Sequence, residues 1–278
     1  MLVSTKEMLQ RARREGYAVP APNFFDFCSA SAYLEVAEAL NKPLILAFAQ
    51  AHMDQFDLED AAMIGRYLAK KASVPVALHL DHGTDETIIK QAIDLGFTSV
   101  MIDASQEKIE ENIMKTKAIV AFARPREVAV EAELGHVGAG DNYEDHEHSD
   151  SIYTKASEVE KFIEMTDVDS LAISIGTAHG IYKGKPKISF NTLHDIFSKT
   201  AIPLVLHGGS SSGEENLHRC ATEGIAKINI FTDIVEGGMK AINNGRPTEL
   251  FELENLRSRG MKAVLEEYYH LLATKTWR

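Results

Sequence analysis

Two histidines and an aspartate stand close together in the stretch VPVALHLDHGTD, residues 74–85. His79, Asp81 and His82 come where an apolar run gives way to a glycine turn. A turn alone would account for the aspartate, because Asp and Gly are common turn residues. The other interpretation is a functional site, since imidazole and carboxylate side chains bind metals and transfer protons.

Two further histidines have the same setting as His82. His179 in AHG and His207 in LHGG each follow an apolar run and adjoin glycine, as His82 does in DHG. Glycine lets the backbone turn tightly and leaves the imidazole free to face a cavity. Three neutral imidazoles with an open position are a common catalytic zinc set. The intervals between them match no local metal motif, so the prediction depends on the fold.

Eight short apolar runs alternate with stretches of helical period, which is the pattern of βα units around a parallel sheet. The predicted strands cover residues 17–24, 43–49, 75–80, 98–103, 127–133, 169–175, 203–207 and 225–230. A (β/α)8 TIM barrel typically needs about 250 residues, so a single barrel domain, residues 1–278, is predicted. Apolar residues at helical spacing over 261–272 predict an additional C-terminal helix, packed on the barrel or on a neighbouring subunit.

Chemistry in such a barrel takes place at the carboxyl ends of the strands. Seven of the eight predicted strands have a polar side chain at that end: Asn23, Asp81 with His82, Asp103, Glu133, His179, His207 and Asn229. The polar residues are therefore expected on one face of the barrel. Asp103 and Glu133 also admit a structural interpretation, as ion-pair or capping residues.

Composition excludes several classes of function. The chain has 278 residues and a net charge of -12, which argues against nucleic acid as a partner. Its apolar runs are too short to span a membrane, and it has two cysteines and no apolar signal segment. A cytoplasmic protein without disulfides is expected, acting on a small molecule.

Five motifs carry a resemblance: PVALHLDHG, EAELGHVG, GTAHGIYKGKPKISF, LVLHGGS and GIAKINIFTD. Together they resemble the class II, metal-dependent ketose-bisphosphate aldolases, the family of fructose- and tagatose-bisphosphate aldolases, in register from about residue 15 to 245. The resemblance implies that His82, His179 and His207 bind catalytic zinc. It implies that Asp81 is the proton donor, and that a second divalent cation can lie at Asp103 and Glu133.

The resemblance also implies where dihydroxyacetone phosphate is held. The corresponding positions are Gly180, Gly208, Gly209, Ser210, Asn229, Ile230, Phe231 and Thr232. Asn23 is expected beside them as a substrate-binding residue. A glycine-rich segment and a helix start suit this task, because backbone N–H groups bind phosphate there. A homodimer or homotetramer is implied in the same way.

The implied reaction is the reversible aldol cleavage of a ketose 1-phosphate or ketose 1,6-bisphosphate to dihydroxyacetone phosphate and an aldehyde. It needs an electron sink at the C2 carbonyl, a base for the C4 hydroxyl and a phosphate anchor. Zinc can supply the sink and stabilise the enediolate, while Asp81 can transfer the hydroxyl proton. In this family an acidic residue on the loop after EAELGHVG handles the C3 proton. Glu144 is the first candidate, with Asp141 and Asp145 as alternatives.

Departures from the family pattern bear on the substrate. Asp26 stands where an asparagine is usual, Ala49 where a hydroxyl residue is common, and the acidic loop is altered. We therefore predict that this is not the glycolytic fructose enzyme. Its substrate is expected to be a related sugar phosphate of a catabolic pathway, similar to tagatose or fructose bisphosphate. Candidates for a distal phosphate are Arg246, Arg257 and Arg259.

Lys227 shares strand parity with Asn229 and should point into the barrel, where a Schiff-base aldolase would use a lysine. The preferred interpretation is a buried structural pair with Glu131, and His79 is expected to orient Asp81. Two other functions stay open. One is a sugar-phosphate isomerase or epimerase, and the other is a non-catalytic sugar-phosphate-binding protein.

Overall fold

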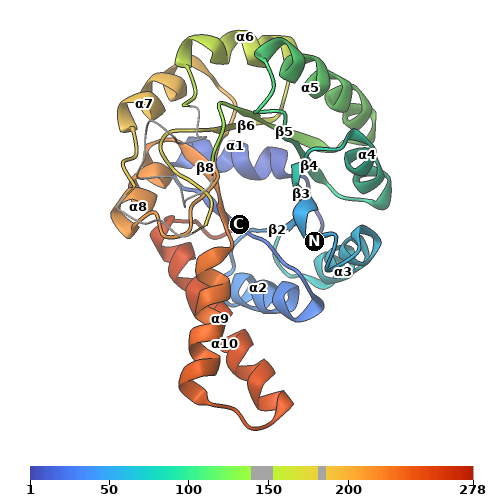
Figure 1. Cartoon of the computed structure of the whole chain (residues 1–278), viewed down its shortest axis with the longest axis vertical. Helices are drawn as coiled ribbons and strands as arrows, with labels where there is room; N and C mark the ends of the chain where they lie inside the picture. The colour runs from blue at the N-terminus through green and yellow to red at the C-terminus, as the bar shows by residue number, and fades with distance from the viewer. Residues whose placement is uncertain (139–152, 181–185, 278) are drawn as a thin grey trace.

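Eight parallel strands form a barrel surrounded by helices, as predicted (Figure 1). The computed structural model describes residues 1–138, 153–180 and 186–277. The strands are β1 (Val19–Pro22), β2 (Leu44–Ala49), β3 (Val76–Gly83), β4 (Ser99–Ile102), β5 (Ala129–Leu134), β6 (Ser170–Ile173), β7 (Leu204–Leu206) and β8 (Ile225–Ile230). Neighbours pair in the order β1-β8-β7-β6-β5-β4-β3-β2, and a parallel bridge between Asn23 and Ala47 closes the ring.

A helix follows each strand and covers the outside of the barrel (Figure 1). These helices are α2 (Phe27–Leu40), α3 (Leu58–Lys71), α4 (Glu86–Leu95), α5 (Ile109–Ala123), α6 (Ala156–Thr166), α7 (Phe190–Lys199), α8 (Glu214–Glu223) and α9 (Thr232–Gly245). Strand β2 shows why both faces of the sheet must be apolar. Leu44, Leu46 and Phe48 join the core under the helices, while Ile45 and Ala47 pack inside the barrel.

Helix α1 (Thr5–Glu15) precedes the first strand and was not among the predicted elements. It begins at the capping residue Ser4, and Figure 1 shows it crossing the middle of the ring of strands. Met8, Leu9 and Ala12 are buried against residues near the N-terminal ends of the strands, such as Val19. The helix therefore closes the N-terminal end of the barrel, opposite the polar strand ends.

The additional C-terminal helix exists and is longer than predicted. Helix α10 (Leu250–Leu271) forms a hairpin with α9 that projects from the barrel (Figure 1). The two helices approach closely at Gly237 and Gly260. A Cβ atom on Gly260 would lie only 2.2 Å from the Gly237 carbonyl oxygen, so a larger residue does not fit there. Met261 and Leu265 return to the main core. None of the helices in the described ranges is long and apolar enough to cross a membrane.

Candidate active site

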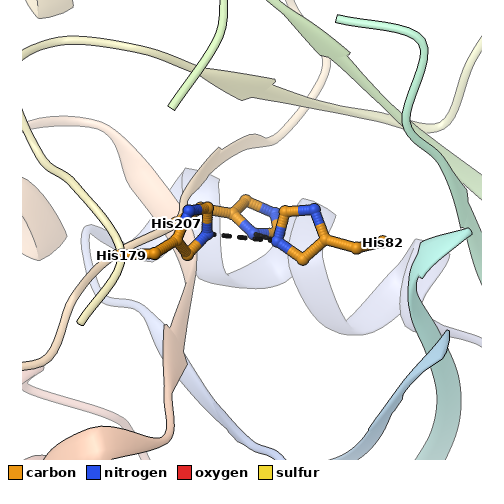
Figure 2. Close-up of side chains that lie close together, drawn as sticks. All are labelled: His82, His179 and His207. Atoms are coloured by element: carbon orange, nitrogen blue, oxygen red, sulfur yellow. Dashed lines mark hydrogen bonds between the residues drawn. The ribbon is translucent and has the colours of Figure 1, made fainter. Parts of the chain in front are cut away.

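Three imidazole rings meet at the carboxyl end of the barrel (Figure 2). His82 lies in β3, His179 in the segment after β6, and His207 directly after β7. The Nε2 atom of His82 is 3.2 Å from Nε2 of His179 and 2.9 Å from Nδ1 of His207. Three histidines that are far apart in the sequence thus each place one ring nitrogen at a common point.

The other nitrogen of each ring has a protein partner. His82 Nδ1 lies 2.8 Å from Asp103 Oδ2, His207 Nε2 lies 3.0 Å from Glu131 Oε1, and His179 Nδ1 lies 3.2 Å from the Val137 carbonyl oxygen. A carboxylate or carbonyl on the outer nitrogen keeps the proton there and fixes the ring. The inner nitrogens then present lone pairs to a common centre, so this donor set fits a divalent cation with nitrogen ligands.

His82 has an unusual backbone conformation, and its Nε2 atom contacts both other histidine rings. Its φ of 48° lies in the left-handed region, which is costly for a residue with a side chain. The next residue is closely packed, since a Cβ atom on Gly83 would lie 2.5 Å from the Met101 carbonyl oxygen. Such backbone strain concentrates at functional sites, and here it turns His82 toward the other two rings.

The electrostatics of the rings favour one positive charge in the cluster. Burial lowers the pKa of His179 to about 3 and also lowers the pKa of His207. Burial would lower the pKa of His82 too, but the charge of Asp81 and the hydrogen bond to Asp103 outweigh it and raise that pKa to about 9. The carboxylates around His82 thus favour positive charge among the rings, and a divalent cation on the inner nitrogens would supply it.

A second group of possible ligands shares His82. Ligand atoms of His82, Asp103 and Glu133 all lie within 4.8 Å of one another. Glu133 accepts a hydrogen bond from the Val137 N–H through Oε1 (3.0 Å), but its buried Oε2 has no partner. Burial and the charge of Asp103 raise the pKa of Glu133 to about 8. The unpartnered oxygen has the chemistry to bind a cation, although Asp103 also has the structural role of pairing with His82.

Asp81 is buried and held from both sides. Its Oδ1 accepts a hydrogen bond from Asn229 Nδ2 at 2.7 Å, and its Oδ2 accepts one from Asn23 Nδ2 at 2.8 Å. Burial would raise the pKa of this carboxyl, but His82 and His207 outweigh burial and hold it well below its usual range. Asp81 is therefore a fixed, ionised carboxylate beside the imidazoles.

A buried polar layer lies beneath the histidines. Lys227 Nζ contacts both oxygens of Glu131 at 2.8 and 2.9 Å, so the predicted structural pair is confirmed. The expectation that His79 orients Asp81 is wrong. His79 lies instead 2.8 Å from Ser99 Oγ and 3.1 Å from Lys227 Nζ, and burial lowers its pKa to about 3. Residues 79 and 81 both point into the barrel, as their shared strand parity predicts. They lie, however, in different layers of the barrel interior.

A cavity of about 300 Å³ opens at this end of the barrel. Its lining includes the three histidines with Asn23, Asp81 and Asn229, and the predicted phosphate-binding set Gly180, Gly208, Gly209, Ser210, Ile230, Phe231 and Thr232. Ala49, Ala51 and His52 also line it, and His52 was not among the predicted site residues. Its signal was weak, because it lies in the connection after β2 without a neighbouring glycine.

The glycine-rich segment after β7 is tightly folded. Gly208 has a φ of 66°, and a Cβ atom on it would lie 2.3 Å from the Ala178 carbonyl oxygen. Ser210 Oγ accepts hydrogen bonds from the N–H groups of Phe231 and Asp233, at 3.2 and 3.3 Å, where α9 begins at Thr232. The first N–H groups of a helix lack intrahelical partners, so the cavity borders a place suited to an anion.

None of the three candidate arginines for a distal phosphate lines this cavity. Glu144, Asp141 and Asp145 lie outside the described residues. Arg257 Nη1 pairs with Asp26 at 2.8 Å, which ties α10 to the N-cap of α2. Arg246 and Arg259 belong to the α9–α10 hairpin, and neither lines the cavity.

A barrel with three convergent imidazoles, a fixed carboxylate and a glycine-rich turn beside a helix start offers the side chains and N–H groups that a divalent cation and an anion would need. The chain belongs to the class II fructose-bisphosphate aldolase family, whose model matches residues 3–276. It is therefore a class II aldolase, an aldehyde-lyase, and the family implies a divalent metal.

The relatives differ in their substrates. The chain is 38% identical over 270 residues to the 6-phospho-5-dehydro-2-deoxy-D-gluconate aldolase of Halalkalibacterium halodurans, covering 95% of this chain and 93% of the relative. It is 40% identical over 247 residues to the fructose-bisphosphate aldolase of Staphylococcus aureus, covering 87% and 85%. The crystal structure of the YdjI aldolase from Escherichia coli K12 superimposes with a TM-score of 0.89 at 31% identity, covering 99% and 98%.

Proposed function

We propose that this aldolase reversibly cleaves a ketose 1-phosphate or ketose 1,6-bisphosphate to dihydroxyacetone phosphate and an aldehyde. A catabolic sugar phosphate, tagatose- or fructose-bisphosphate-like, is the proposed substrate. The observation that carries the proposal is the ionised Asp81, held by Asn23 and Asn229 beside three convergent imidazoles. The relatives named above support a phosphorylated sugar or sugar acid.

His82, His179 and His207 would hold a catalytic Zn²⁺, and Asp103 with Glu133 would hold a second divalent cation beside it. When bound, zinc polarises the ketose carbonyl and stabilises the negative charge that develops on its oxygen. The inner ring nitrogens and the unpartnered Glu133 Oε2 support this assignment.

The protein's own residues move the protons and hold the substrate. Asp81 accepts the proton of the C4 hydroxyl in cleavage and returns it in condensation, because its fixed position and ionised state suit a general base. Glu144, or one of its acidic neighbours Asp141 and Asp145, would transfer the C3 proton. Phosphate binding is assigned to backbone N–H groups of the cradle formed by Gly180, residues 208–210 and residues 229–232.

The test is a condensation assay with dihydroxyacetone phosphate and a panel of aldehydes. Protein stripped by a chelator should have no activity, and zinc should restore it. His179→Ala should lose metal and activity together, whereas the exposed His270→Ala should keep both. Full activity in metal-free protein would contradict the mechanism, and interconversion of ketose phosphates without triose would favour an isomerase.

A homodimer or homotetramer is also proposed, with residues 1–278 acting as one domain. The exposed Leu250 and Phe251, at the start of α10 in the projecting hairpin, support association between copies. Sedimentation equilibrium should give a mass of two or four chains, and a single-chain mass at micromolar concentration would contradict this proposal.

A further inference from the structure

His52 lines the cavity, and none of the steps of the proposed reaction uses it. It ends a short 3-10 helix (Gln50–His52) directly after β2. Its ring packs in a tilted arrangement against Phe231, a residue of the phosphate cradle, with 4.9 Å between the ring centroids and 43° between the planes. His52 therefore has a fixed ring at the mouth of the site.

The ring nitrogens of His52 have no hydrogen-bond partner among the described residues. Its Nδ1 is buried without a hydrogen-bond partner, and no side-chain hydrogen bond links His52 to any other residue of the described ranges. A buried polar group left unpaired is destabilising, so such groups in native sites usually meet a ligand or water. Burial also lowers the pKa of His52. A neutral imidazole offers one donor and one acceptor, which complements an uncharged hydroxyl.

The position of His52 corresponds to the aldehyde half of the substrate. In the proposed reaction the phosphate occupies the cradle, the C2 carbonyl faces the three histidines, and the C4 hydroxyl meets Asp81. The lining residues left over, apart from Asn23, are Ala49, Ala51 and His52. The carbons beyond C4 therefore face two small apolar side chains and one unpaired imidazole.

The described residues that line this side of the cavity carry no fixed positive charge. Among the described residues that line the cavity there is no lysine or arginine. A phosphate group is held in proteins by such side chains or by a helix N-terminus, and the start of α9 is already assigned to the first phosphate. A second phosphate would need residues from outside this lining.

We infer that His52 is a specificity-determining residue that hydrogen-bonds a hydroxyl group of the aldehyde half. The preferred aldehyde is hydroxylated and carries no phosphate, so the cleaved substrate is a ketose monophosphate. This inference rests on the proposed function and, of its two substrate classes, selects the ketose 1-phosphate over the ketose 1,6-bisphosphate.

The first experiment compares three aldehydes in condensation with dihydroxyacetone phosphate on the zinc-loaded enzyme. D-glyceraldehyde should exceed propionaldehyde in kcat/KM by about tenfold or more, the factor that one hydrogen bond of typical strength gives. It should also exceed D-glyceraldehyde 3-phosphate. A preference for the phosphorylated aldehyde would overturn the inference and place a cationic subsite on another segment or subunit.

The second experiment removes the nitrogens of His52. His52→Phe keeps an aromatic ring against Phe231 and should reduce the ratio of kcat/KM for glyceraldehyde over propionaldehyde to about one. His52→Gln retains a donor and an acceptor and should recover part of that ratio. The exposed His270→Phe is the matched control and should leave the ratio unchanged. An unchanged ratio in both His52 variants would overturn the assignment.

Proton exchange at C3 of dihydroxyacetone phosphate, measured without aldehyde, distinguishes a failure of the proposed aldolase function from a failure of the role of His52. Exchange should proceed in the wild type and in His52→Phe at similar rates, which also shows that the variant is folded. No exchange in the wild type would contradict the proposed function itself. Exchange with unaltered aldehyde selection would contradict only the role of His52.

Discussion

Asp81 has one amide donor on each carboxylate oxygen, Asn229 on one side and Asn23 on the other. These bonds fix the plane of the carboxylate and favour its ionised form, as hydrogen bonds to a charged group do. Asp81 lines the cavity beside the histidines. A base fixed in this way needs no rearrangement before it takes a proton from a bound hydroxyl.

Asp81→Ala should therefore lower the cleavage rate by at least about a hundredfold, the usual contribution of a general acid or base. Zinc content and affinity for dihydroxyacetone phosphate should stay close to wild type, because the ligand atoms belong to other residues. Single-turnover cleavage and metal analysis of the same preparation check this. Near-normal turnover would assign the proton to another group.

At the residue scale the sequence allowed the three histidines to be selected, because each follows an apolar run and adjoins glycine. The partners of those residues could not be selected, since they depend on which strands face each other. Asn23 was expected to bind substrate, and in the structure it holds Asp81. His52 has neither a strand end nor a glycine beside it, so only the folded chain places it in the cavity.

At the scale of elements, β3, β5 and β8 share one buried polar layer. Lys227 is fully buried and makes an ion pair with Glu131, which in turn contacts His207. Burial would raise the pKa of Glu131, but Lys227 and the hydrogen bond from His207 outweigh it and hold that pKa below its usual range. The layer thus connects the packing of the barrel to the orientation of a candidate metal ligand.

Lys227→Met should destabilise the protein by about 3–5 kcal/mol, because it leaves the buried carboxylate of Glu131 without its cation. Urea denaturation measures this, with the exposed Lys240→Met on α9 as the control. Borohydride treatment in the presence of dihydroxyacetone phosphate should trap no covalent adduct in the wild type. An adduct at Lys227 would instead support Schiff-base chemistry.

The barrel strands were predictable because eight apolar, β-branched runs at regular intervals leave few other architectures. The observed strand ends differ from the predicted ones by a few residues, because hydrogen bonds between strands define them in the structure. Helix α1 was missed because its buried residues, Met8, Leu9 and Ala12, are few among charged neighbours. Helix α10 begins at Leu250, before the region of clear helical spacing, because it first pairs with α9 and only then reaches the core.

At the scale of the whole molecule, the candidate zinc ligands come from β3 and from the segments after β6 and β7. A cation bound by all three would connect distant parts of one barrel, and it would bind the folded state only. Binding at a hundred times its dissociation constant stabilises a protein by about 2.7 kcal/mol.

Zinc should therefore raise the melting temperature of the stripped protein by about 5 °C, given about 2 °C for each kcal/mol in a chain of this size. Differential scanning calorimetry with and without metal checks this. His207→Ala should abolish the shift, and His218→Ala on α8 should retain it. A shift of equal size in both variants would locate the stabilising metal elsewhere.

Helix α1 closes one end of the barrel, so both reactants must reach the histidines from the other end, past His52 and Phe231. In the proposed reaction the triose phosphate would lie in the phosphate cradle and the aldehyde nearer the opening, beside His52. Binding should then be ordered, with dihydroxyacetone phosphate entering first in condensation and leaving last in cleavage. Accumulated triose phosphate would then compete with the ketose for the free enzyme. The closure of one barrel end by α1 thus determines the pattern of product inhibition.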